Sequence, residues 1–130
     1  MQRKKPVMLS TLGVALGVSL AISLWIATAS SVTAADRFLS VIDDLPLAPN
    51  LTEVDGSASV FSKPQGRIVE VLASGKSEMA RVLVFYAKAL PQLGWKSSGA
   101  AIWVREGERL SLDIKESGGD VTVRFSLVPQ

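Results

Sequence analysis

The side chains available for chemistry in this chain are carboxylates, amines, guanidinium groups and hydroxyls, because its 130 residues include no cysteine and no histidine. This composition excludes disulfides, cysteine nucleophiles, imidazole acid–base catalysis, haem ligation and ordinary zinc sites. We therefore predict that the protein is not an enzyme, and that it has no catalytic residues, no metal site and no cofactor.

The remaining polar groupings are too sparse to predict a catalytic site. They are Asp43-Asp44, Glu106 with Glu108, Arg67 with Glu70, and Ser74 with Lys76 and Ser77. Adjacent carboxylates on an irregular segment usually point apart, and a metal or acid–base pair needs further oxygens within reach. Alternating charges around a glycine are typical of a solvated hairpin tip. The serines lie outside a nucleophile-elbow motif and have no histidine base.

Three aromatic residues are the candidate contacts with a partner, namely Trp103, Phe85 and Trp95. Phe85 and its neighbour Val84 fall outside the main apolar stripe of the predicted helix, so that helix is apolar on more than one side. Either the core wraps around the helix, or an apolar strip is exposed. An exposed strip would mark contact with a partner protein, a lipid or a membrane.

One helix is expected after Ser77, whose side chain suits an N-cap position. Its apolar stripe follows helical spacing and consists of Met79, Val82, Leu83, Tyr86, Leu90 and Leu93. Pro91 lacks the amide needed by the helical ladder, so the helix should end or kink near Leu90. Gly94 is predicted as a left-handed C-cap.

The strands predicted around this helix give an α+β fold. The β-rich or alternating runs are 57–61, 67–73, 102–104, 109–115 and 121–127, and 95–98 is the least certain further strand. Lys63-Pro64-Gln65-Gly66 predicts a hairpin turn between the first two runs. The predicted order is β-β-α-β-β-β, an antiparallel sheet with one amphipathic helix packed on one face.

The direction of Trp103 depends on the turn at 105–107. A three-residue loop with Gly107 in a bulge places Ile102 opposite Leu110 in the core, and Trp103 then faces outward. A two-residue loop reverses the faces and buries Trp103. The bulge is the preferred interpretation, because it aligns five aliphatic residues on one face.

The N-terminus has the features of an export signal. Residues 2–5 contain three basic side chains, residues 7–29 are uncharged, and small residues follow up to Ala34. We predict residues 1–34 to be a signal peptide cleaved after Ala34, and the alternative is an uncleaved inner-membrane anchor formed by residues 7–29. Both place the remainder outside the cytoplasm, in the periplasm or secreted, as an extended arm at 35–56 and a single domain at 57–130.

The charge of the exported part argues against nucleic-acid binding. Residues 1–34 hold three of the 14 basic residues and none of the 12 acidic ones, so the formal charge without them is −1. The pI of 9.2 therefore belongs to the precursor. No basic patch remains for nucleic acid to bind.

The sequence resembles small, uncharacterised exported proteins of Gram-negative bacteria that carry a domain of unknown function. The motifs behind this resemblance are Asp43-Asp44-Leu45-Pro46-Leu47, Gly66-Arg67-Ile68-Val69-Glu70, Phe85-Tyr86 followed by Leu90-Pro91-Gln92-Leu93-Gly94-Trp95, and Arg105-Glu106-Gly107-Glu108. They span most of residues 43–125, and their residue types are structural. The resemblance implies no functional residues.

These observations favour a non-enzymatic accessory or interaction module of the bacterial cell envelope. Its expected partner is another envelope protein or a lipid. The alternative is a carrier that holds a small apolar ligand or lipid between the helix and the sheet. The residues do not predict the oligomeric state.

Overall fold

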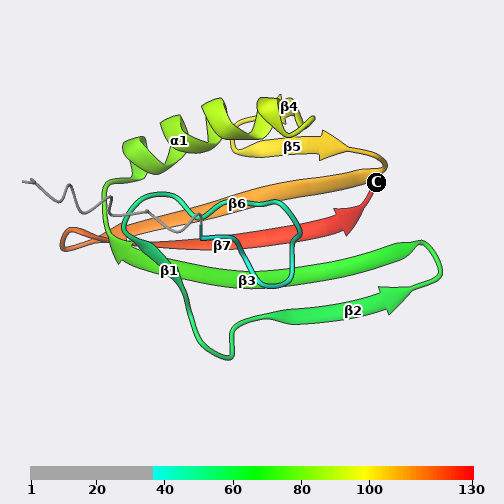
Figure 1. Ribbon diagram of the computed structural model, residues 1–130, viewed down its shortest axis with the longest axis horizontal. Helices are drawn as coiled ribbons and strands as arrows, with labels where there is room; N and C mark the ends of the chain where they lie inside the picture. The colour runs from blue at the N-terminus through cyan, green and yellow to red at the C-terminus, as the bar shows by residue number, and fades with distance from the viewer. Residues whose placement is uncertain (1–36) are drawn as a thin grey trace, which may run out of the picture. The chain divides into compact units, whose positions relative to one another are not determined.

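The computed structural model describes residues 37–130, and the signal-peptide and anchor predictions lie outside these residues (Figure 1). The α+β prediction is confirmed, since one helix accompanies an open antiparallel sheet. The elements are β1 (Leu51–Glu53), β2 (Ser59–Lys63), β3 (Gly66–Lys76), α1 (Met79–Gln92), β4 (Lys96–Gly99), β5 (Ile102–Arg105), β6 (Glu108–Ser117) and β7 (Asp120–Pro129). In this part of the chain, no helix is long and apolar enough to span a membrane.

The sheet order is β1-β3-β7-β6-β5-β4, with every pair antiparallel. β3 is long enough to pair with two strands on one edge, with β1 at Ala73–Gly75 and with β2 at Gly66–Glu70. The hairpin predicted at Pro64-Gln65 is present between β2 and β3. β1 adds one strand to the predicted order, and β4 corresponds to the least certain strand, which was predicted at 95–98.

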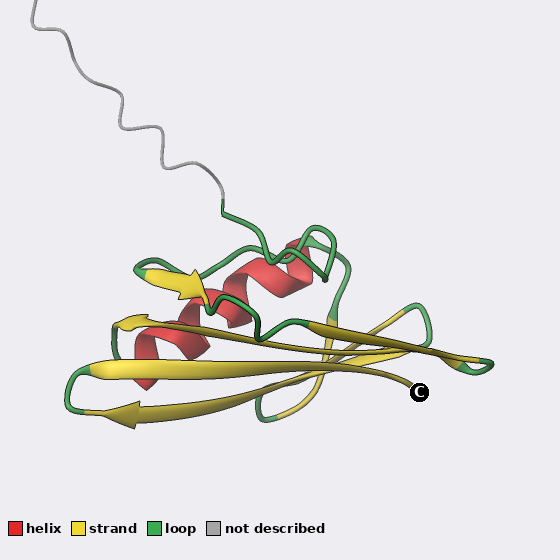
Figure 2. Cartoon of the chain, turned by 90° about the horizontal axis from the view of Figure 1, so that it is seen from below, coloured by secondary structure: helices red, strands yellow, loops and turns green. Residues whose placement is uncertain are grey.

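The core lies on one face of the sheet, because alternate side chains of each strand point to the same side. Its fully buried residues on the long strands are Val69, Val71, Ala73, Leu110, Val121, Val123, Phe125 and Leu127. Both α1 and the segment 37–50 cover this face, as Figure 2 shows from the side. The opposite face carries half-buried aliphatic residues between charged ones such as Asp113 and Arg124, which is typical of a solvated sheet face.

The segment 37–50 doubles back on itself instead of running as the extended arm expected for 35–56. Phe38 forms a bridge with Pro46, and the Leu39 amide donates a hydrogen bond to the carbonyl of Leu45 at 3.0 Å. Leu39, Ile42, Leu45 and Ala48 are buried against the sheet. The segment is therefore part of the core and not a separate arm.

The ends of α1 are fixed by two different contacts. Ser77 is not the N-cap: Glu78 occupies that position without a side-chain cap, and Glu116 of β6 accepts the Met79 amide at 2.9 Å. At the other end, the Trp95 amide bonds to Leu90 O and the Gly94 amide to Pro91 O. With Gly94 at φ 86° this is a Schellman cap, which confirms the glycine prediction.

The buried line of α1 is narrower than the stripe read from the sequence. Val82, Tyr86 and Leu90 are fully buried. Leu83 and Met79 are only half-buried. The helix therefore faces the sheet through the i, i+4, i+8 row, and Leu83 lies at the margin of the contact.

The turn between β5 and β6 has two residues, so the preferred bulge was wrong. Arg105 pairs with Glu108, and Glu106 and Gly107 both have positive φ, at 49° and 78°. This is the conformation of a type I′ hairpin turn, whose twist matches that of the strands. Trp103 consequently stands opposite Leu110 on the core face.

Tyr86 joins the helix to the segment 37–50, which we call the covering segment. Its hydroxyl donates to Pro46 O at 2.8 Å and accepts the Ala48 amide at 3.2 Å. Its ring packs edge-on against Phe125, with centroids 5.5 Å apart. Burial raises the pKa of Tyr86, and the hydrogen bond from Ala48 opposes that shift only in part.

Tyr86→Phe is expected to lower the free energy of unfolding by about 1–2 kcal/mol at neutral pH, because the Ala48 amide loses its acceptor. The substitution should also remove a loss of stability that the wild type shows at alkaline pH. The folded wild type keeps the phenolic proton above pH 10, where the unfolded chain releases it, so wild-type stability is complete below pH 10 and falls above it by up to about 1.4 kcal/mol per pH unit. Urea denaturation of both proteins at pH 8 and pH 11 checks this. A parallel alkaline loss in both would contradict it.

Candidate docking surface

The structure separates the three aromatic candidates for a partner contact. Trp103 is only 5% exposed and Trp95 only 2% exposed, so both are core residues. The prediction that Trp103 faces outward is therefore wrong, and the two-residue turn is the reason. Phe85 is half-buried on α1, next to Val84, which is 53% exposed. Of the three, Phe85 alone is placed to meet a partner directly.

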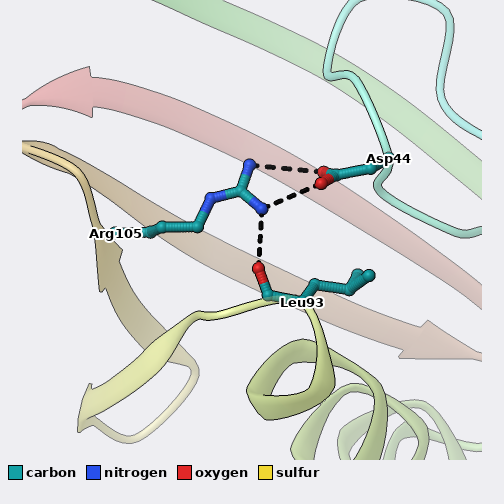
Figure 3. A network of polar contacts seen from close by, with 3 residues as sticks. All are labelled: Asp44, Leu93 and Arg105. Carbon is teal, nitrogen blue, oxygen red and sulfur yellow. Dashed lines mark hydrogen bonds and ion pairs between the residues drawn. The ribbon is translucent and has the colours of Figure 1, made fainter.

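Arg105 is the centre of a polar clamp next to Trp95, and Figure 3 shows its contacts with Asp44 and Leu93. The Arg105 guanidinium lies 4.4 Å from the centre of the Trp95 ring and donates to Leu93 O at 2.8 Å. It also forms a two-pronged ion pair with Asp44, at 2.9 and 3.3 Å. A cation over an indole face and at the end of a helix is stabilised in both places. The clamp ties the segment 37–50 to the end of α1 and to β5.

The acidic groupings form ion pairs or remain in solvent. Glu108 bonds to Arg67 at 2.9 Å, and this hydrogen bond raises the pKa of Arg67. Asp44 is held by Arg105, while Asp43 and Glu70 are exposed. Within residues 37–130, no three acidic side chains gather closely enough to hold a metal ion.

A hollow that involves Phe85 lies between α1 and the end of the covering segment. It is a groove of about 500 Å³. Its walls include Pro49 and Asn50 on one side and Arg81, Val84, Phe85 and Lys88 on the other. We call this surface the α1 groove.

The α1 groove combines an apolar floor with a basic rim. Val84 and Phe85 come from the flank of α1 that does not face the sheet, while Tyr86 fixes that flank by binding the segment that contains Pro46 and Ala48. Among the described residues, Arg81 forms an ion pair only with Glu78, at 3.4 Å, and both side chains are largely exposed, so solvent screens the pair. Lys88 forms no ion pair with any described residue. The groove therefore presents apolar and positively charged side chains next to one another.

The space between helix and sheet, where a carrier would hold its ligand, is occupied by side chains near its centre. Tyr86 contacts Phe125 edge-on with ring centroids 5.5 Å apart, and Phe85 contacts Tyr86 in the same geometry at 5.0 Å. Leu112 and Leu90 are buried beside them. An apolar hollow that opens to the outside is the α1 groove.

Comparison with known proteins adds no relationship, because no protein-family model, no curated protein and no solved structure matches this chain. The site is therefore described from its own residues. Phe85 was identified by its position off the helical stripe. The residues Pro49 and Asn50 carried no such signal, because their place in the groove depends on how a distant loop folds against α1.

Proposed function

We propose that this protein is a non-enzymatic interaction module of the bacterial cell envelope, exported to the periplasm or held at the inner membrane by residues 7–29. The observation that carries the proposal is the α1 groove, in which Val84 is 53% exposed beside half-buried Phe85. Exposed apolar side chains gathered around a hollow are typical of a protein contact.

The chemistry of the groove indicates its partner. Arg81 and Lys88 stand seven residues apart on α1, two helical turns, and so flank the apolar floor at both ends. We propose that the occupant is a segment of another envelope protein that inserts apolar side chains over Val84 and Phe85 and places carboxylates near the two cations. Opposite charges at a rim set the register and the association rate more than the affinity.

The double substitution Arg81→Glu and Lys88→Glu tests this pairing. It reverses the rim charge and leaves Val82, Tyr86 and Leu90, the buried line of α1, unchanged. We expect partner recovery by chemical crosslinking of intact cells to fall at least about tenfold, with the melting temperature within a few degrees of wild type. Lys115→Glu and Arg124→Glu on the opposite face of the sheet are the matched control and should leave recovery unchanged.

Two results would contradict the proposal. Equal recovery with the double variant and with wild type would show that the rim cations do not contact the partner. A native mass spectrum of the purified full-length protein in which a phospholipid fills the groove would support the carrier instead.

A further inference from the structure

The two edges of the sheet are protected very differently. β4, at one edge, is short and polar, begins with Lys96, ends with Gly99 and has an irregular register between Ser97 and Gly99. Such features discourage a second strand from pairing. β2, at the other edge, presents Val60 and Phe61, which are 49% and 61% exposed.

The free edge of β2 is five residues long and has fixed ends. It pairs with β3 alone among the described elements (Figure 1). Beyond Lys63 the chain turns at Pro64-Gln65, and before Ser59 it leaves the sheet at the bend near Gly56. In a hairpin with a two-residue turn, the residues that flank the turn form a hydrogen-bonded pair, and hydrogen-bonded pairs then alternate with pairs that lack hydrogen bonds. Lys63 and Gly66 are the flanking pair, so the backbone groups of Val60 and Ser62 point away from β3. These groups can accept one more strand.

We propose that a second copy of this chain occupies this edge, with the two β2 strands antiparallel and centred on Phe61. This register is the one that pairs all five residues of both strands. It places Phe61 opposite the partner's Phe61, as a close pair without hydrogen bonds between them, and lets Val60 and Ser62 exchange backbone hydrogen bonds across the axis.

The side chains suit this register in both shape and charge. Phe61 stands opposite Ile68 in the β2–β3 ladder, so the apolar row runs on into the next strand of each copy. The partner subunit's Lys63 would stand opposite Ser59, and Ser59 in turn stands opposite Glu70 of β3. The two long side chains can meet over the small serine across two strand spacings, about 10 Å. Within residues 37–130, Lys63 and Glu70 form no ion pair of their own.

Charge reversal distinguishes this dimer from any other. We expect the full-length protein in mild detergent to show a concentration-dependent dimer by sedimentation velocity. Lys63→Glu and Glu70→Lys should each weaken it at least about tenfold, because two attractive pairs become two repulsive ones. The double variant Lys63→Glu with Glu70→Lys should restore wild-type association, because both pairs re-form with opposite polarity.

Phe61→Lys is a second test of the dimer, and Val84→Lys is its matched control, because both substitutions replace a largely exposed apolar residue. We expect Phe61→Lys to abolish the dimer and Val84→Lys to preserve it. A wild-type monomer at all concentrations would overturn the proposal, and so would a dimer that Phe61→Lys leaves intact. Because β2 lies outside the α1 groove, loss of this dimer and loss of the envelope partner are separate outcomes.

Discussion

Trp103→Ala is expected to lower the free energy of unfolding by about 3–5 kcal/mol, the cost of removing a large aromatic side chain from a packed core. Trp103 is 5% exposed and pairs with Leu110, which is completely buried. The measurement is a urea or guanidinium denaturation of the variant and of wild type, compared by midpoint and slope.

The matched control for Trp103 is Val104→Ala. Val104 is the next residue of β5, so its half-buried side chain points to the uncovered face of the sheet. We expect this change to cost no more than about 1 kcal/mol. If Trp103→Ala cost as little as Val104→Ala, Trp103 would face solvent and the turn would contain the bulge.

Gly75→Ala is expected to destabilise the fold by about 3 kcal/mol, although it adds only one methyl group to a residue near the end of β3. A Cβ on Gly75 would overlap the carbonyl oxygen of Asn50 and lie 2.9 Å from its carbonyl carbon. Those atoms belong to the backbone where the covering segment enters β1, so a side-chain rotation cannot relieve the overlap. Thermal unfolding followed by circular dichroism should show the melting temperature falling by more than about 10 °C.

Gly99→Ala is the control for Gly75. Both glycines lie in strands, but a Cβ on Gly99 would meet only the Ile102 side chain, at ordinary contact distances of 3.7 and 3.8 Å. We expect its effect to lie within about 1 kcal/mol of zero. Equal destabilisation by the two substitutions would show that chain flexibility, and not the Asn50 contact, determines the loss at Gly75.

The parts of the fold with strong local signals could be predicted from the sequence. The two-residue periodicity of 109–115 and 121–127 gave the faces of β6 and β7 correctly, since Leu110 and Phe125 are buried as the alternation requires. Gly94 after Pro91 marked the end of α1, because a left-handed cap favours glycine.

The incorrect prediction for the turn at 105–107 shows where local sequence information is insufficient. Gly107 suits both a bulge and a type I′ turn, and Glu106 at φ 49° is not a residue type that favours either. The structure selects the two-residue turn, which buries Trp103 and directs Arg105 to Asp44 and the end of α1. Those partners lie 61 and 12 residues away in sequence, so no local pattern encodes the choice.

The candidate site was predictable only on its helical side. Phe85 and Val84 could be recognised because they lie off the apolar stripe of one helix. The opposite wall needs the segment 37–50 to double back, which depends on the Phe38–Pro46 bridge and on the hydrogen bonds from Tyr86. Trp103 was assigned to the partner contact because the predicted bulge would turn it outward, but both Trp103 and Trp95 are buried in the core.

The most direct test of the proposed interaction function is site-specific photocrosslinking from Val84 in the full-length protein in living bacteria. Thr122, exposed on the uncovered face of the sheet, is the control position. We expect one protein adduct from Val84 and none from Thr122, with the crosslinked peptide containing apolar and acidic residues and with the adduct lost when Arg81→Glu and Lys88→Glu are added. A phospholipid adduct, the same adduct from Thr122, or an adduct insensitive to the rim charges would contradict the assignment of the α1 groove as the partner site.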